Sequence, residues 1–162
     1  MQDAVQEQPD TAESVRRFAE LSGEESVLVA GEAGLAASLQ PNVREVVQVE
    51  ADRLTDLPFP RGRFDLAAMI GTLRNARRPE LAVAELARVT RHGGHLLVVD
   101  RVAPVDPLTA IELDRRERER DPAHTRFLPD ADMRGLFEAN GLVLLRSQFD
   151  PRTETGWYLL RR

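Results

Sequence analysis

Residues 43–66, VREVVQVEADRLTDLPFPRGRFDL, decide the fold of this chain. Valine dominates residues 43–49, as is typical of a β-strand, and this strand runs into the acidic residue Glu50. A second strand is expected at residues 64–70, directly after the LPFP segment. Only residues 51–63 separate the two strands, and a parallel crossover needs about a dozen residues or more. The stretch therefore predicts two strands whose connection is close to the shortest that a parallel sheet allows.

The rest of the sequence alternates between helical and strand periodicity. A continuous apolar run at residues 26–30 is typical of a strand buried on both faces. The last two expected strands are separated only by a loop, so we expect them to pair antiparallel. The pattern predicts an α/β fold: a Rossmann-like, mostly parallel sheet with helices on both faces and a C-terminal antiparallel hairpin. The expected helices are residues 11–22, 35–39, 79–90, 108–120 and 130–140, and the further strands are 26–30, 95–100, 142–147 and 156–160, with a turn at 91–94. In the helix at 79–90, Leu81 is among the apolar residues expected to point inward.

The length of 162 residues fits a single domain, which we assign to residues 11–162 after an N-terminal tail at 1–10. The first residues are polar and acidic and lack the apolar stretch of a secretory signal. The longest apolar runs, such as HLLVV at 95–99, are too short to cross a bilayer. We therefore expect a cytoplasmic protein with no membrane partner.

Residue usage excludes several kinds of site. The chain has no Cys, so a thiolate nucleophile and a thiolate metal site are impossible. All 22 basic residues are Arg, which excludes a Schiff-base lysine and a P-loop lysine. A net charge of −5 argues against nucleic acid as a partner, because phosphate binding requires a basic face. No spacing of His, Asp and Glu is typical of a metal site.

Five segments together resemble the class I S-adenosylmethionine-dependent methyltransferases, in the small-molecule branch related to the ubiquinone/menaquinone methyltransferases. The resemblance covers roughly residues 25–148 and implies a Rossmann-like fold, S-adenosylmethionine as cofactor and methyl transfer to a small-molecule acceptor. The matching segments are VLVAGEAG at 27–34, VREVVQVE at 43–50, LPFPRGRFDLAAM at 57–69, PELAVAELARVTRHGGHLLVVDRVAP at 79–104 and DPAHTRFLPDADMRGLFEANGL at 121–142.

The resemblance also implies that one unit is missing. In that family a helix and a further strand normally separate the two strands of residues 43–66, so this chain is one strand–helix unit shorter. Residues 51–63 must then cross to the far side of the first strand, which leaves the Val-rich strand at an exposed edge of the sheet. We expect a homodimer or a partner protein to cover that edge.

The same resemblance identifies cofactor-binding candidates. It implies a glycine loop at Gly31, Glu32 and Gly34, which is degenerate because Ala33 replaces the middle glycine and Val29 stands where the family has an acid. Glu32 is either a substitute for that acid or a solvated loop carboxylate. Glu50 is either a ribose-binding carboxylate or a solvent-facing residue at a strand end. Asp52 is the alternative acid, near the adenine, and Ile70 at the end of the third strand is the last candidate.

Catalytic residues are less evident. Residues 71–75, GTLRN, follow the third strand and offer no general base. His124 and Arg126 match a His–x–Arg element of the resemblance and are weak candidates to face a substrate, although a His in a connecting loop is more often structural. Two functional classes therefore stay open: a methyltransferase, or a catalytically inactive methyltransferase-fold scaffold or partner subunit that has lost cofactor binding.

Overall fold

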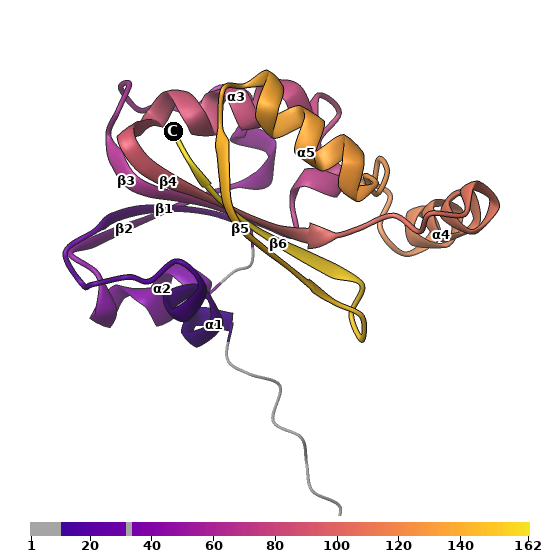
Figure 1. Cartoon of the computed structure of the whole chain (residues 1–162), viewed down its shortest axis with the longest axis horizontal. Coiled ribbons are helices and arrows are strands. Elements are labelled where there is room, and N and C mark those ends of the chain that lie inside the picture. The colour runs from indigo at the N-terminus through magenta and orange to yellow at the C-terminus, as the bar shows by residue number, and fades with distance from the viewer. Residues whose placement is uncertain (1–10, 32–33) are drawn as a thin grey trace, which may run out of the picture.

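A computed structural model describes residues 11–31 and 34–162 of the chain. They form one six-stranded sheet in the order β2-β1-β3-β4-β6-β5 (Figure 1). The first four strands of that order are parallel, and β6 runs antiparallel to both of its neighbours. This confirms the predicted mostly parallel sheet with a C-terminal hairpin. The strands are β1 (Ser26–Gly31), β2 (Glu45–Val49), β3 (Phe64–Ile70), β4 (Thr90–Arg101), β5 (Val143–Asp150) and β6 (Thr155–Arg161).

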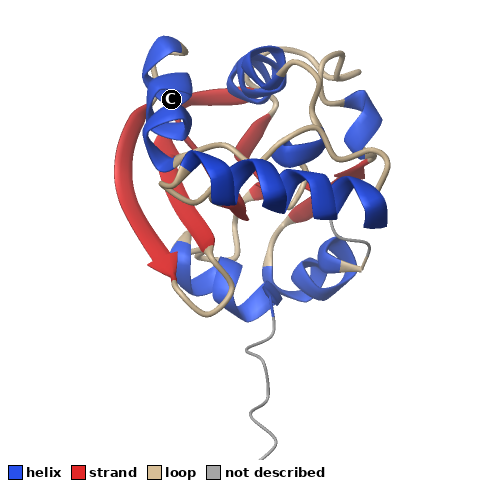
Figure 2. Cartoon of the chain, turned by 90° about the vertical axis from the view of Figure 1, so that its right-hand side faces the viewer, coloured by secondary structure: helices blue, strands red, loops and turns tan. Residues whose placement is uncertain are grey.

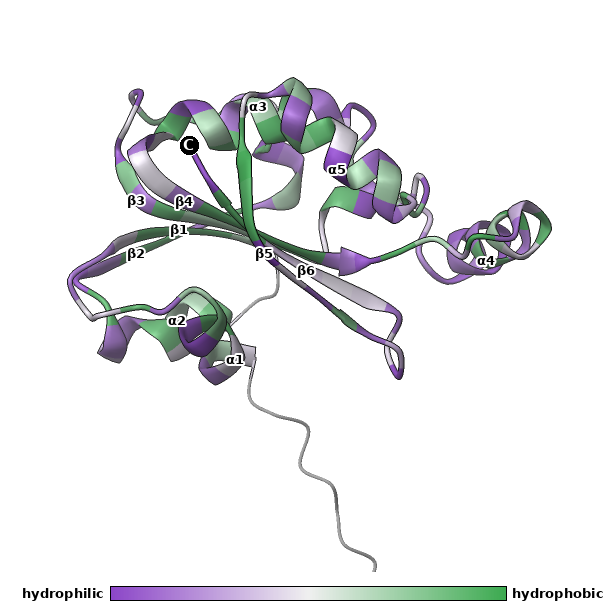
Figure 3. Cartoon of the chain, in the orientation of Figure 1, coloured by the Kyte–Doolittle hydropathy of each residue, from purple (hydrophilic) through white to green (hydrophobic). Residues whose placement is uncertain are grey.

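Helices cover both faces of the sheet, as predicted, because the buried strands are apolar on both sides (Figures 1 and 3). One core lies between the sheet and helices α1 (Thr11–Phe18) and α2 (Leu35–Leu39). The other lies between the sheet and helices α3 (Pro79–Val89) and α5 (Asp130–Ala139). None of the described helices is long and apolar enough to cross a membrane.

Helix α4 (Pro107–Arg120) differs from the other long helices, because it contributes no buried residue. It projects beyond the end of β4, and in the turned view it lies in front of the sheet (Figures 1 and 2). Asp106 caps its first turn by accepting a hydrogen bond from the backbone N–H of Thr109 at 2.8 Å. Its Arg and Glu side chains pair with one another along the helix, for example Arg116 with Glu112.

Three local expectations were wrong. α1 ends at Phe18, before the expected residue 22, because Glu20 adopts a left-handed φ of 53°. Leu81, expected to point inward from α3, is 37% exposed. The expected turn at 91–94 lies within β4, where a register shift against β3 makes these residues a bulge in one continuous strand.

The crossover after β2 has the predicted path. Of the strands that the structure describes, β2 pairs only with β1, whereas β3 lies on the other side of β1, so β2 is an edge strand. Residues 51–63 contain no helix beyond a single 3-10 turn, η2 (Ala51–Arg53), and they place the side chains of Leu54 and Leu57 in the core. These two leucines supply part of the apolar contact that holds a short connection against the sheet.

A polar clamp from α3 fixes the same connection. The Glu85 carboxylate accepts a hydrogen bond from the backbone N–H of Leu57 at 2.9 Å. The Arg88 guanidinium donates to the carbonyl oxygens of Leu57 and Phe59 at 3.0 and 2.8 Å, and it pairs with Glu85 at 2.7 Å. α3 therefore satisfies backbone groups that the crossover would otherwise leave without partners.

This clamp predicts a pH-dependent contribution to stability. The Arg88 guanidinium holds the pKa of Glu85 below its ordinary value of 4.5, so the stabilisation is present above that value and is lost as the pH falls through it and below. We expect Glu85→Gln to lower the free energy of unfolding by about 1–2 kcal/mol at pH 7 and by less at pH 3, measured by urea denaturation at both pH values. Glu80→Gln, at an exposed pair with Arg78, is the control and should cost less than about 0.5 kcal/mol. If the difference in free energy of unfolding between Glu85→Gln and the wild type were the same at both pH values, the charge of Glu85 would not be its cause.

Candidate functional site

The candidate site lies at the carboxyl ends of β1, β2 and β3. The chain passes from β1 to β2 on one side and then returns to β3 on the other side of β1. In open parallel sheets, such a reversal of strand order leaves a crevice where ligands bind. The predicted site residues that the structure describes can be placed relative to this crevice.

Gly31 ends β1 at the crevice and pairs in register with Ile70, the last residue of β3. Its φ is 133°, and a Cβ added to it would lie 2.1 Å from the carbonyl oxygen of Ile70. No side chain fits there without moving the backbone. The close approach of β1 and β3 therefore explains this glycine even before a ligand is considered.

Gly34 has a different environment. It precedes α2 with a φ of 92°, and an added Cβ would meet no atom within 4 Å. The backbone at this position is therefore open to a neighbouring group. Glu32 and Ala33, the other residues of the predicted loop, lie outside the described residues, so the prediction for Glu32 is not tested.

Glu50 directly follows β2 and is exposed. Its carboxylate has no hydrogen-bond partner within the described part of the chain, nor does it cap the 3-10 turn that follows. The end of β2 is tied to the end of β1 by Gln48, whose side-chain amide lies 3.4 Å from the carbonyl oxygen of Gly31. An unpaired acceptor thus lies one strand away from Gly31, at the same edge of the sheet.

Asp52 lines a groove of about 380 Å³ beside Glu50. One wall of the groove is the start of the crossover after β2, and the other is the segment between β3 and α3. The exposed side chain of Leu81 contributes apolar surface, which explains why this leucine does not point inward. The groove is lined by Ala51, Asp52, Leu54, Thr55, Asn75, Ala76, Arg77, Arg78 and Leu81.

Asp100, which the sequence reasoning missed, fixes the turn that follows β3. This carboxylate near the end of β4 is 2% exposed and accepts hydrogen bonds from the backbone N–H groups of Arg74 and Arg101 at 3.1 and 2.8 Å. Burial raises the pKa of Asp100, while the N–H donors and the charge of Arg74 act to lower it. The carboxylate therefore anchors the 3-10 turn η3 (Leu73–Asn75) against β4. The signal in the sequence was an acid directly after the apolar run LLVV.

The two weak catalytic candidates do not face a common site. His124 is buried, and its Nε2 lies 2.7 Å from a carboxylate oxygen of Asp114 in α4. The same oxygen accepts a hydrogen bond from the backbone N–H of Phe127 at 2.9 Å. The ring centroids of Phe127 and His124 lie 4.4 Å apart. Arg126 is exposed and lines a different groove, between α3 and α5. The contacts of His124 are those of a residue that holds α4 to the loop at 121–127.

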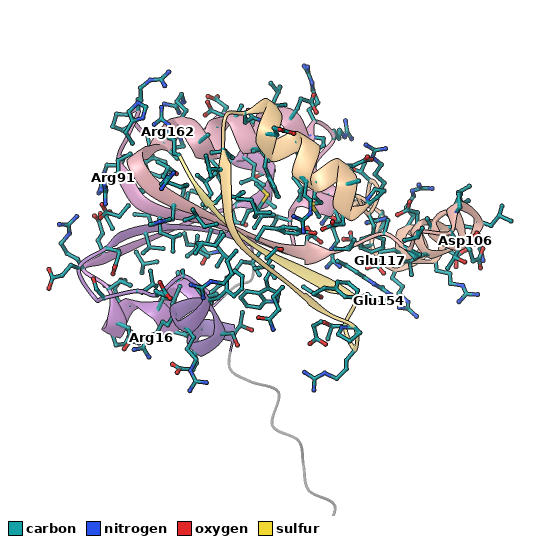
Figure 4. The ribbon with its side chains drawn as sticks, in the orientation of Figure 1. Arg16, Arg91, Asp106, Glu117, Glu154 and Arg162 are labelled. Atoms are coloured by element: carbon teal, nitrogen blue, oxygen red, sulfur yellow. The ribbon has the colours of Figure 1, made fainter. Side chains whose placement is uncertain are left out.

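A larger cavity, of about 750 Å³, lies beyond the end of β4. Its lining is mainly apolar and includes Val102, Ala103, Pro104, Pro129 and Phe149. Glu154, which pairs with Arg101, also lines it and lies at the hairpin end of the sheet nearest α4 (Figure 4). Within residues 11–31 and 34–162, no cluster of His, Asp and Glu side chains could hold a metal ion.

Comparisons with known proteins agree with this geometry. The methyltransferase domain family matches residues 12–98, more than half of the chain. The uncharacterized methyltransferase YcgJ of Bacillus subtilis is 33% identical over 99 residues, which are 61% of this chain and 39% of the relative. The ubiquinone/menaquinone biosynthesis C-methyltransferase UbiE of Hahella chejuensis is 37% identical over 70 residues, which are 43% of this chain and 27% of the relative. The matches thus span well under half of the length of these relatives.

Solved structures share the fold over nearly the whole chain. Protein BH2331 of Bacillus halodurans superimposes with a TM-score of 0.78 at 22% identity, over 94% of this chain and 97% of the other. A 1,6-didemethyltoxoflavin-N1-methyltransferase of Burkholderia thailandensis, solved with bound S-adenosylhomocysteine, has a TM-score of 0.69 at 16% identity, over 94% of this chain and 76% of the other. The chain therefore belongs to the methyltransferase domain family, with the Rossmann-like fold of class I S-adenosylmethionine-dependent methyltransferases.

Proposed function

We propose that this chain is an S-adenosylmethionine-dependent methyltransferase that acts on a small molecule. The observation that carries the proposal is the crevice at the carboxyl ends of β1 and β2, where Gly31 ends one strand and Glu50, whose carboxylate has no partner among the described residues, follows the next. Family membership supports the reaction class.

The described residues fit the proposed cofactor. Glu50 offers an exposed carboxylate, which can accept hydrogen bonds from both ribose hydroxyls. The groove beside it combines the carboxylate of Asp52 with the apolar surface of Leu81, which suits a flat base that carries an amino group. The backbone at Gly34, where an added Cβ would meet no atom within 4 Å, leaves room for the amino-acid end of the cofactor.

When bound, S-adenosylmethionine would supply an electrophilic methyl group on a sulfonium. The protein would then contribute mainly by holding the cofactor and the acceptor close together in the right orientation, which alone can supply much of the rate enhancement. Residues 71–75 provide no general base, so the acceptor suited to this site is one that is already nucleophilic. The apolar cavity beyond β4 is a suitable place for a small apolar acceptor, consistent with a relative that acts in quinone biosynthesis.

Calorimetric titration with S-adenosylmethionine and S-adenosylhomocysteine tests this proposal. We expect saturable binding of both ligands with one site per chain. An absence of binding at millimolar ligand would reject the enzyme and favour the alternative, an inactive scaffold or partner subunit.

Glu50→Ala should weaken cofactor binding more than any other single loss of a charge at the site. Removing a charge-assisted acceptor is expected to cost about 1.5–3 kcal/mol, or roughly tenfold to a hundredfold in Kd. The control is Glu24→Ala, at an exposed glutamate before β1 and therefore at the opposite end of the sheet. If Glu50→Ala bound the cofactor as tightly as the wild type and Asp52→Ala bound it more weakly, the ribose contact would be assigned to Asp52 instead.

We further propose that a second copy of the chain covers the β2 edge. Among the described strands this one pairs on one side only, and Glu45, Val46 and Val47 are only partly buried, so its outer side offers backbone groups and some apolar surface to a second copy. Light scattering of the full chain should give the mass of a dimer. A monomer at all concentrations would reject this interface.

A further inference from the structure

Thr72 carries a buried hydroxyl group to which no described residue forms a hydrogen bond. The residue follows β3 by two positions and is 5% exposed. Its Oγ1 is shielded from solvent and has no hydrogen-bond partner among residues 11–31 and 34–162, which is uncommon in folded proteins and calls for an explanation. Although Thr72 occupies the N-cap position of η3, its side chain makes no capping hydrogen bond.

The side chain of Thr72 lies against the end of β1. A Cβ added to Gly31 would come within 3.3 Å of the Thr72 methyl carbon, so the threonine side chain packs directly against the glycine backbone. Gly31 is also where the crevice begins. The Thr72 side chain therefore lies beside the strand end at which a bound cofactor would place its amino-acid end.

The turn that carries Thr72 is held firmly. Asp100 accepts the backbone N–H of Arg74 at 3.1 Å, and the carbonyl oxygen of Arg74 accepts the backbone N–H of Thr125 at 2.9 Å. The carbonyl oxygen of Thr72 itself accepts the N–H of Asn75 at 3.1 Å. Because these backbone hydrogen bonds hold the turn on both sides of Thr72, the lack of a partner for its hydroxyl is not ascribed to a poorly held loop.

We propose that Thr72 is a further cofactor-binding residue, whose hydroxyl donates a hydrogen bond to the carboxylate of the amino-acid end of S-adenosylmethionine. The inference rests on the proposed function and extends it to a residue that neither the sequence pattern nor the comparisons assign. It also explains the orphan hydroxyl, because the ligand supplies the partner that the free protein lacks.

The experiment compares Thr72→Val with Thr72→Ser. Valine has nearly the shape of threonine without the hydroxyl, whereas serine retains it. Calorimetry with S-adenosylhomocysteine should show a Kd about tenfold higher for Thr72→Val and within about threefold of the wild type for Thr72→Ser. Without ligand, Thr72→Val should melt at the wild-type temperature or a few degrees above it, because valine removes a buried polar group that has no partner.

Methylthioadenosine, which lacks the amino-acid end, localises the contact. Thr72→Val should bind this ligand as tightly as the wild type does. Equal affinity of Thr72→Val and the wild type for S-adenosylhomocysteine would overturn the inference and leave the proposed function intact. An equal loss for both ligands, or a lower melting temperature without loss of affinity, would also overturn it, because either result indicates a structural role. If the wild type binds neither ligand, the proposed function itself fails.

Discussion

Gly31→Ala is expected to lower the free energy of unfolding by about 3–5 kcal/mol, enough to leave much of the protein unfolded at 37 °C. The added Cβ would lie 2.1 Å from the carbonyl oxygen of Ile70, so β1 and β3 would have to separate at the centre of the sheet. The φ of 133° at this position adds further strain for any residue with a side chain. Guanidinium denaturation followed by circular dichroism measures the loss.

Gly34→Ala is the matched control for this variant. Gly34 also has a positive φ, of 92°, but an added Cβ meets nothing within 4 Å. Only the backbone strain applies, so we expect Gly34→Ala to lower the free energy of unfolding by about 1–2 kcal/mol. If both variants lost the same stability, the clash with Ile70 would not be the cause.

These two variants bear on how the glycine loop is interpreted. A resemblance assigns Gly31 to the cofactor, yet the approach of β1 to β3 already requires a glycine at this position. The presence of Gly31 is therefore weak evidence for cofactor binding. Gly34 and Glu50 are more informative, because no packing contact or internal hydrogen bond of the described residues accounts for them.

His124→Ala should be the second most destabilising change, with an expected loss of about 2–4 kcal/mol. The substitution opens a cavity beside Phe127 and removes the partner that the buried imidazole gives to Asp114. Urea denaturation measures this loss. Arg126→Ala is the control, and we expect a change within about 0.5 kcal/mol because that side chain is exposed.

The same pair of variants separates a structural from a catalytic role for His124. A structural role predicts that methyl transfer by His124→Ala, measured at a temperature where the variant is folded, stays close to the wild-type rate. A loss of activity without a loss of stability would instead support the weak catalytic assignment made from the sequence.

Strand order was the most predictable property of this chain. Residues 43–66 allow only a short connection, and a short parallel connection can do little more than pass across one neighbouring strand. The structure confirms that path, with β2 at the edge. The clamp formed by Glu85 and Arg88 was not predictable, because it joins α3 to backbone groups of a segment that has no regular periodicity.

The site was less predictable than the fold. The positions of Glu50 and Gly31 followed from the strand ends, and the structure places both residues at the crevice. Asp100 and Thr72 escaped notice because their importance depends on burial, and burial of a polar side chain has no signature in a single sequence. His124 was noticed, but its structural contact was not predicted, because a single sequence does not show that Asp114 in the expected helix at 108–120 meets this buried side chain.

The lack of buried residues in α4 has a consequence for the dynamics of the chain. An isolated helix of this length is marginally stable in water, so the first turns of α4 can open at little cost in free energy while the sheet stays intact. Amide hydrogens in the first turns of α4 should exchange with solvent far faster than those of β4, which ends close by. Global denaturation will not detect this local opening. Val105 lines the apolar cavity and lies two residues before α4, so we expect helix–coil fluctuation of the first turns to change ligand access on that side without any movement of the core.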